Sequence, residues 1–331
     1  MPFRTIAGHQ RVIALLQRAI AQNTLPPSLL LAGSRGIGKR RVAMALAETL
    51  NCRQQGADAC GECDACRRIG RNIHPDVLVI EPGDTGTIKI DQVRDAIDRS
   101  GYRPFEGRRR VVVIDDADAM VPAAQNALLK TLEEPPSASV FVMVSAIPDS
   151  LLPTVRSRCP KLRFSPLPPA EVAQVLMRDH GYTEADARAV AADAAGSVGR
   201  ALETESADVV AAREFAQRVL TDTARLTDPV RRLEVAKALT SGKNTPAADR
   251  AQLAVCLHAL ASLLRDLGVL ATKSDTRLLA NADLQDDLSR LTASWDERRS
   301  ARAYSAVDQA LAALERNASP KLVMDWLALQ L

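Results

Sequence analysis

The sequence predicts an α/β domain built on a parallel sheet, followed by an all-helical C-terminal half. Three observations lead to this fold class. Short apolar runs alternate with helix-like segments over residues 1–165, a glycine-rich G-x-x-x-x-G-K loop follows the first run at Gly33–Lys39, and the chain beyond about residue 206 shows only helical periodicity. A chain of 331 residues is long enough for two or three domains with sizeable cores.

The composition is ordinary for a soluble globular protein, with 47% hydrophobic and 25% charged residues. The net charge of +3 identifies no class of partner. Aromatic residues make up 3% of the chain, which argues against nucleobases stacking on aromatic side chains. We expect no apolar run of membrane-spanning length and no signal peptide, and therefore a cytoplasmic location with no membrane partner.

The predicted elements follow one another regularly. Apolar spacing predicts helices, and short runs of branched apolar residues predict buried parallel strands. The expected helices cover residues 8–22, 41–50, 88–100 and 123–132, and the expected strands cover residues 29–32, 77–80, 111–114 and 140–145. Arg108–Arg110 is interpreted as a solvent-facing entrance to the third strand, and His74 as a loop histidine.

The loop after the first strand carries residue types that bind phosphate groups. Its glycines let backbone N–H groups approach phosphate oxygens, and Lys39 adds a positive charge at the start of a helix. The next residue departs from the P-loop pattern, because Arg40 stands where a Ser or Thr hydroxyl would ligate Mg²⁺. We expect weak binding of ATP or ADP and little hydrolysis; a glycine-rich turn without a ligand is the alternative.

Two acids follow the strand expected at residues 111–114 and would face the ligand crevice of the sheet. Asp115 can help to hold Mg²⁺. Asp116 is one methylene shorter than the Glu that activates water in P-loop ATPases, so its carboxylate would fall short of that water. A helix cap is the alternative role for Asp116. The residues expected at a degenerate nucleotide site are Gly33, Gly36, Gly38, Lys39 and Asp115.

Four of the six cysteines lie within residues 52–66, in a C-x7-C-x2-C-x2-C pattern. A C-x2-C step lets two thiolates reach one ion, and four thiolates complete the tetrahedral shell of a structural zinc ion. A disulfide pattern is less suited to a chain without an export signal. The predicted zinc ligands are Cys52, Cys60, Cys63 and Cys66.

The P-loop, the cysteines, Asn126–Pro136 (NALLKTLEEPP) and Ser157-Arg158-Cys159 together resemble the bacterial clamp-loader subunits, which are AAA+ proteins of the DNA polymerase III holoenzyme. The resemblance covers residues 3 to about 205. It implies an AAA+ P-loop domain with an inserted zinc-binding module, a small helical lid and an all-α C-terminal collar. The corresponding ranges are 1–166 with the zinc module at 52–66, 167–206 for the lid, and 207–331 for the collar.

Departures from the ATP-hydrolysing gamma/tau motor subunits point to one type of subunit within that family. The motor pattern has Thr after the P-loop lysine, Asp-Glu after the third strand, Thr at the end of a later strand, and Arg in Gly-Ser-x-Arg. This chain has Arg40, Asp115-Asp116, Ser145-Ala146 and Gly196-Ser197-Val198-Gly199-Arg200. These differences resemble the delta-prime type, a stator that hydrolyses little or no ATP.

The resemblance also implies a role for Arg158. In this family a retained Ser-Arg-Cys motif would place Arg158 in the ATP site of a neighbouring motor subunit, as an arginine finger in trans; a surface ion pair is the alternative. The implied partners are gamma/tau and delta subunits, with the sliding clamp reached indirectly and primed DNA through the assembled complex. The alternatives are an ATP-hydrolysing gamma/tau-like motor and a zinc-containing DNA-binding module.

Overall fold

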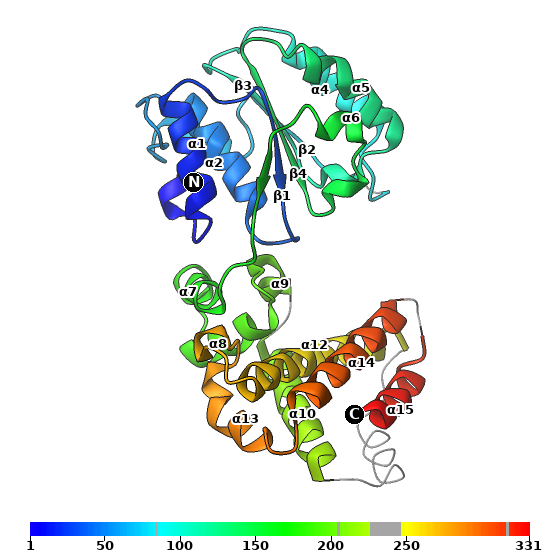
Figure 1. The fold of residues 1–331 in the computed structure, drawn as a ribbon. Coiled ribbons are helices and arrows are strands. Elements are labelled where there is room, and N and C mark those ends of the chain that lie inside the picture. Colours follow the sequence, from blue (N-terminus) through cyan, green and yellow to red (C-terminus); the bar gives the residue numbers. More distant parts are fainter. Residues whose placement is uncertain (84, 204–205, 226–245, 316–317) are drawn as a thin grey trace. The chain divides into compact units, whose positions relative to one another are not determined.

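The computed structural model describes residues 1–83, 85–203, 206–225, 246–315 and 318–331 (Figure 1). The chain divides into two compact units. The first comprises Met1–Leu167 with Ser197–Gly199, and the second comprises Pro168–Gly196 with Arg200–Leu331.

The first unit is built on a five-stranded sheet with the strand order β2-β3-β4-β1-β5. All neighbouring strands run parallel, as the sequence predicted. The strands are β1 (Ser28–Ala32), β2 (Val77–Ile80), β3 (Arg110–Ile114), β4 (Ser139–Ser145) and β5 (Lys161–Arg163). The short strand β5 was not predicted, because its residues Lys-Leu-Arg lack the apolar run that marks the other four.

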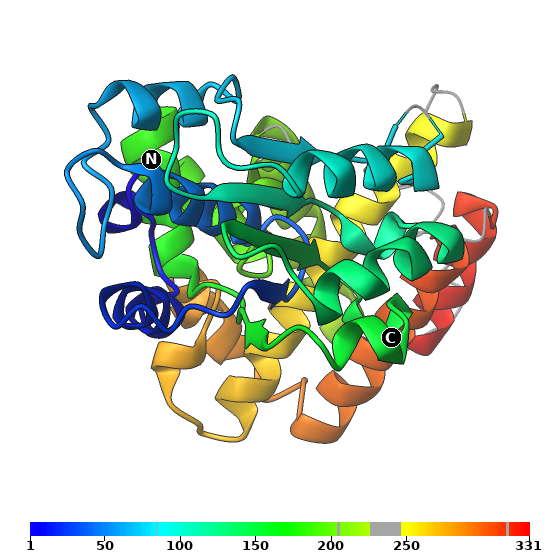
Figure 2. The ribbon, with the colours of Figure 1, turned by 90° about the horizontal axis from the view of Figure 1, so that it is seen from above.

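Helices cover both faces of this sheet. Figure 1 shows α1 and α2 on one face and α4, α5 and α6 on the other, and Figure 2 looks down on the same strands from above. The helices are α1 (Gln10–Ala21), α2 (Lys39–Asn51), α3 (Asp64–Gly70), α4 (Ile90–Ser100), α5 (Pro122–Glu133) and α6 (Pro153–Arg156). The first, second, fourth and fifth were predicted, and α3, which follows the cysteine loop, was not.

Alternate residues of β1 pack on opposite faces. Leu29 and Leu31 join the core beneath α1 and α2, whereas Leu30 and Ala32 join the core beneath α4 and α5. Successive side chains of a strand point to opposite faces, so a strand covered on both sides needs apolar residues at every position. This requirement explains the unbroken apolar runs from which the strands were predicted.

The strand order brings three loops to one edge of the sheet. Ala32 at the end of β1 pairs with Ser145 at the end of β4, and Ile114 at the end of β3 pairs with Met143 of β4. The loops that follow β1, β3 and β4 therefore begin side by side at the carboxyl edge, where open α/β sheets bind ligands.

The second unit is helical in its described residues. Its helices are α7 (Pro169–His180), α8 (Glu184–Asp193), the greater part of α9 (Val198–Glu203), α10 (Ser206–Arg225), α12 (Pro246–Ala271), α13 (Gln285–Leu291), α14 (Glu297–Glu315) and α15 (Pro320–Gln330). The core lies where α12 packs on α10 and α14. Trp295 is fully buried there and donates its indole N–H to the carbonyl oxygen of Leu220 at 3.1 Å, as expected of a core anchor.

One expectation about this half of the chain was wrong. Residues Gln252–Ala271 of α12 form a helix that is long and apolar enough to cross a membrane, judged by length and composition alone. Half of that stretch is buried in the unit, and Leu257, Leu263 and Leu267 lie in its core. The central helix of a helical bundle passes the same test, because it is covered by its neighbours on several sides.

Candidate functional site

The loop between β1 and α2 has the close backbone approaches that its glycines predict. A Cβ atom on Gly33 would lie 2.5 Å from the carbonyl oxygen of Phe164, so no larger residue fits without a shift. Gly38 has a φ of 102° and stands at the N-cap of α2, a conformation that only glycine adopts readily. The chain thus turns sharply from strand to helix at the carboxyl edge of the sheet.

Lys39 is the first residue of α2 and is buried, with 6% of its surface exposed. Its ammonium group donates hydrogen bonds to the carbonyl oxygens of Gly33 and Ser34, both at 2.7 Å. Burial lowers the pKa of Lys39, and the nearby charges of Asp115 and Asp116 oppose that shift. The lysine therefore faces the acids that follow β3, while two of its three donors hold the loop.

Arg40 lies next to the acid that was expected to hold Mg²⁺. Its Nη1 donates to Oδ2 of Asp115 at 3.0 Å, and its Nη2 forms a second ion pair with Glu81. The other oxygen of Asp115 accepts the backbone N–H of Asp116 at 3.1 Å. Both oxygens of Asp115 therefore have donors, and a guanidinium stands beside the carboxylate where the motor pattern would have a metal ion.

Asp116 turns away from this pair. It has a φ of 45° and stands at the N-cap of the short helix Ala117–Ala119, although its side chain makes no capping hydrogen bond. Its carboxylate is 3.8 Å from the guanidinium of Arg35. In this structure Asp116 is an ion-pair partner of the loop, and the simple capping role considered for it is wrong.

Arg158 follows α6, and about a third of its side chain is exposed. Its guanidinium pairs with Glu133 at the end of α5 and donates to the carbonyl oxygen of Thr154 at 2.8 Å. The structure thus places Arg158 beside Glu133, the first residue of the Glu-Glu-Pro-Pro segment that ends the Asn126–Pro136 stretch. The side chain is accessible and its charge is partly balanced within its own unit.

The four predicted cysteine ligands come together. Their four Sγ atoms all lie within 4.8 Å of one another, and the Sγ atoms of Cys60 and Cys66 are 3.9 Å apart. A tetrahedron with metal–sulfur bonds of about 2.3 Å has edges of about 3.8 Å, so the spacing fits a single ion. The sulfur of Cys60 also accepts backbone N–H groups from Glu62 at 3.4 Å and Cys63 at 3.3 Å, which lower its pKa.

The N-terminal segment packs on the cysteine loop. The carboxylate of Asp58 accepts the backbone N–H groups of Phe3 at 2.7 Å and Arg4 at 3.2 Å. The guanidinium of Arg4 donates to the carbonyl oxygens of Ala59 at 2.7 Å and Cys60 at 2.9 Å. Phe3 itself is buried in the core beneath α1 and α2. The cysteine loop therefore also fixes the start of the chain.

The interpretation of Arg108–Arg110 as a solvent-facing strand entrance is wrong for Arg110. Only 8% of Arg110 is exposed, and its Nη2 pairs with the fully buried carboxylate of Asp76 at 2.9 Å. Sequence reasoning also missed Asp76, for which no pattern offered a signal. Its two oxygens accept the backbone N–H groups of Phe105, Glu106 and Gly107.

His74 lies in the same buried cluster as Asp76, apart from the four cysteines that come together as candidate metal ligands. Only 4% of it is exposed, and its Nδ1 accepts the backbone N–H of Asp76 at 3.2 Å. Burial lowers the pKa of His74, while the neighbouring carboxylates of Glu106 and Asp76 oppose that shift. It is therefore a structural histidine, more deeply buried than a loop residue was expected to be.

Comparison with known proteins places the first half of the chain in a family. The family described as "DNA polymerase III, delta subunit" matches residues 8–168. The delta' subunit of DNA polymerase III from Pseudomonas aeruginosa is 45% identical over 143 residues, covering 43% of each chain. The delta' subunit from Bacillus subtilis is 35% identical over 167 residues, covering 50% of each chain.

A gamma/tau subunit matches over a similar length of the chain. The DNA polymerase III subunit gamma/tau of Mycobacterium tuberculosis is 35% identical over 177 residues, covering 53% of this chain and 31% of that protein. The chain thus spans half or less of the length of these three relatives. On these matches, residues 8–168 belong with the DNA polymerase III clamp-loader subunits, which include delta' and gamma/tau.

Proposed function

We propose that the chain is a delta-prime-like stator of the DNA polymerase III clamp loader, which helps to load the sliding clamp on primed DNA and hydrolyses little or no ATP itself. The observation that carries this proposal is the ion pair between Arg40 and Asp115, 3.0 Å apart. An aspartate in this place helps to hold Mg²⁺ in active P-loop enzymes, and Mg²⁺ neutralises the charge that develops on the phosphates. Here the guanidinium of Arg40 pairs with that carboxylate in place of a metal ion.

The loop keeps the glycine turn and the buried lysine of a P-loop, which supports weak binding of ATP or ADP at Gly33, Gly36, Gly38, Lys39 and Asp115 as part of the proposal. Phosphate oxygens would have to attract the Lys39 ammonium away from two carbonyl oxygens of the loop. They would also meet the acids Asp115 and Asp116 without a divalent cation between them. Both features favour weak binding and disfavour cleavage.

Arg158 would act outside its own chain. A guanidinium that stabilises the transition state of phosphoryl transfer in a neighbouring subunit must be accessible and permanently charged. Arg158 is a third exposed and rests on Glu133 and the Thr154 carbonyl. A phosphate bound in a motor subunit would replace Glu133 as its anionic partner.

The cysteine cluster would hold a structural zinc ion. Cys52, Cys60, Cys63 and Cys66 supply four thiolates, which fill a tetrahedral shell and leave no position for a reacting water. The ion would cross-link residues 52–66. The hydrogen bonds that Asp58 and Arg4 make would then also hold the N-terminal segment in place. Its contribution is therefore stability of the first unit.

We further propose that residues 167–206 form a lid and residues 207–331 a collar, through which the chain joins gamma/tau and delta subunits. In support, the second unit begins at Pro168, and a long helix, α10, begins at Ser206. The molecule would then be a component of the DNA polymerase III holoenzyme, a nucleotidyltransferase, without carrying a nucleotidyltransferase site of its own.

The deciding experiment measures ATP turnover by the purified chain and by a loader reconstituted with gamma/tau-type and delta subunits. We expect negligible turnover by the chain alone and DNA-dependent turnover by the assembly. Brisk hydrolysis by the isolated chain would make it a gamma/tau-like motor. Tight binding of primed DNA by the chain alone, falling steeply with salt, would instead favour the DNA-binding module.

A further inference from the structure

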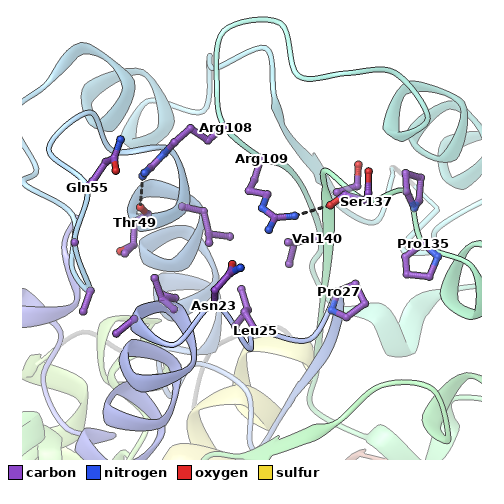
Figure 3. Close-up of a pocket in the computed structure, with 17 residues that line it drawn as sticks. Asn23, Leu25, Pro27, Thr49, Gln55, Arg108, Arg109, Pro135, Ser137 and Val140 are labelled. Atoms are coloured by element: carbon purple, nitrogen blue, oxygen red, sulfur yellow. Dashed lines mark hydrogen bonds between the residues drawn. The ribbon is translucent and has the colours of Figure 1, made fainter.

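A cavity of about 710 Å³ opens at the amino edge of the sheet, opposite the edge that carries the P-loop. Pro27, Arg109 and Ser139 line it at the starts of β1, β3 and β4. Figure 3 shows Pro27 and Arg109 in this lining, together with Asn23, which follows α1, and Thr49 near the end of α2. The volume lies in the range typical of ligand sites, and the proposed nucleotide and cysteine sites do not use this cavity.

The charge of the cavity lining is one-sided. Among the 17 described residues that line it are two arginines, Arg108 and Arg109, and no aspartate or glutamate. The acids Glu133 and Glu134, which precede the prolines of the lining, are not among them. The whole chain has nearly balanced charges, with 43 Lys and Arg against 40 Asp and Glu. An anionic ligand is therefore favoured here by the local lining and not by net charge.

Both arginines are held on a fixed turn. The buried Asn51 accepts the backbone N–H groups of Arg108 at 2.9 Å and Arg109 at 3.0 Å through its Oδ1. A Cβ on Gly107 would lie 2.5 Å from that oxygen, so glycine is what allows Asn51 to approach. The backbone that carries the two guanidinium groups is thus set before any ligand binds, which reduces the entropy lost on binding.

The guanidinium groups also have donors to offer. Nη2 of Arg108 donates to the carbonyl oxygen of Thr49, and Nη1 of Arg109 donates to that of Ser137 at 2.5 Å (Figure 3). Nη2 of Arg108 also donates to the carbonyl oxygen of Cys52 at 2.9 Å. Each guanidinium has five N–H donors in a planar fork, and these contacts use one nitrogen of each. A fork held at one nitrogen can still pair with a carboxylate or phosphate.

The rest of the lining distinguishes between anions. Its apolar members are aliphatic residues and prolines, and no aromatic side chain lines the cavity to stack a nucleobase. They are Ile20, Ala21, Leu25, Pro27, Leu50, Ala57, Pro135, Pro136 and Val140. An acidic peptide offers both carboxylates for the arginines and aliphatic side chains for these walls, whereas a nucleic acid strand would use only the arginines.

We propose that this cavity binds a short acidic and aliphatic segment of another protein, whose carboxylates pair with Arg108 and Arg109 while an adjacent aliphatic side chain packs on the apolar wall. The site lies on the sheet edge opposite the P-loop. Binding there therefore leaves the carboxyl edge accessible, and the inference does not depend on the ATPase assignment.

The test uses the full chain and a fluorescein-labelled pentapeptide of alternating aspartate and leucine. We expect saturable binding by fluorescence anisotropy, weakened about tenfold or more in the double variant R108Q/R109Q because charge-assisted hydrogen bonds are lost. The double variant R67Q/R71Q makes the same charge change outside the cavity and should bind as the parent does. Absence of saturable binding, equal binding of an asparagine–leucine peptide, or equally tight binding of oligothymidylate would overturn the proposal.

A second measurement avoids the question of whether the double variant folds. A benzophenone-bearing version of the peptide is photo-cross-linked to the unaltered chain, and the adducts are mapped by mass spectrometry. Labelling within residues 20–27 or 135–140 supports the proposal, because both segments line the cavity. Labelling confined to other parts of the chain overturns it.

Discussion

Arg40 and Asp115 form an ion pair, with Nη1 of the arginine 3.0 Å from Oδ2 of the aspartate. The two residues belong to the two halves of the proposed nucleotide site, the helix after the P-loop and the tip of β3. In an active site of this kind both positions would serve one Mg²⁺ ion. The guanidinium of Arg40 balances the negative charge of Asp115 that a metal ion would otherwise neutralise.

Replacing Arg40 with threonine should open the site to Mg²⁺. R40T supplies a hydroxyl and leaves Asp115 without its cationic partner, so we expect affinity for Mg²⁺-ATP to rise about tenfold or more. Hydrolysis should remain low, because the carboxylate of Asp116 pairs with Arg35 and its side chain is too short to reach the water that a glutamate would activate. Titration with a fluorescent ATP analogue, with and without Mg²⁺, measures the change.

R41T is the matched control, since Arg41 is the exposed neighbour of Arg40 on the same helix. It makes the same chemical change without touching Asp115. If R40T and R41T bind Mg²⁺-ATP equally, the ion pair is not what limits the site.

Removing the guanidinium of Arg158 should impair a neighbouring subunit and leave this chain folded. An arginine finger contributes about 10³-fold or more to phosphoryl transfer, so R158A should slow ATP cleavage at the adjoining motor site by about that factor. Single-turnover measurements on the reconstituted loader report that site. The Tm of the isolated variant should stay close to that of the parent, because a partly exposed ion pair contributes little to stability.

R156A serves as its control. Arg156 is similarly exposed, lies two residues away and pairs with Asp149. Equal ATP turnover by loaders carrying R158A and the unaltered chain would contradict the arginine-finger role. Equal losses of turnover in R158A and R156A would indicate a general effect on α6.

Metal analysis of the purified chain should find one zinc ion per molecule. Chelation or the variant C60S/C63S should lower Tm and raise hydrogen exchange in residues 1–9, because Asp58 and Arg4 join that segment to the cysteine loop. The second unit provides the internal reference, and its exchange should not change. A zinc-free chain with the same exchange pattern would contradict the assignment.

The sequence predicted those parts of the molecule that follow from local pattern. Branched apolar runs located four strands, and the glycine spacing located the loop. Both patterns are visible in the sequence because each is set by residues that are close together along the chain. Strand β5 has no such run and is held by its pairing with β1.

The partners of the charged residues could not be predicted in this way. Arg40 and Asp115 are 75 positions apart, and Asp76 and Arg110 are 34 apart. Which charge meets which is decided by the strand order, which places β3 directly beside β2 and separates it from β1 by β4 alone. For the same reason Arg110, read within its triplet, was taken for a surface residue.

The Asp76 cluster gives the last prediction, a dependence of stability on pH. Burial alone would raise the pKa of Asp76, but the N–H groups of Glu106, Phe105 and Gly107 and the guanidinium of Arg110 outweigh it and hold the pKa at about 2. A folded-state pKa below the ordinary value of 3.8 stabilises the fold above that value, and the contribution is lost as pH falls from about 4 to about 2. The difference corresponds to about 2 kcal/mol.

The variant D76N removes this charge and leaves Arg110 buried without its anion, which should lower the free energy of unfolding at pH 7 by about 3–5 kcal/mol. Urea unfolding followed by circular dichroism measures it, with D95N as the control because Asp95 is an exposed acid of α4. The difference in stability between D95N and D76N should shrink as pH falls toward 2, since Asp76 itself becomes protonated there. A constant difference across that range would show that the Asp76 charge does not hold the loop.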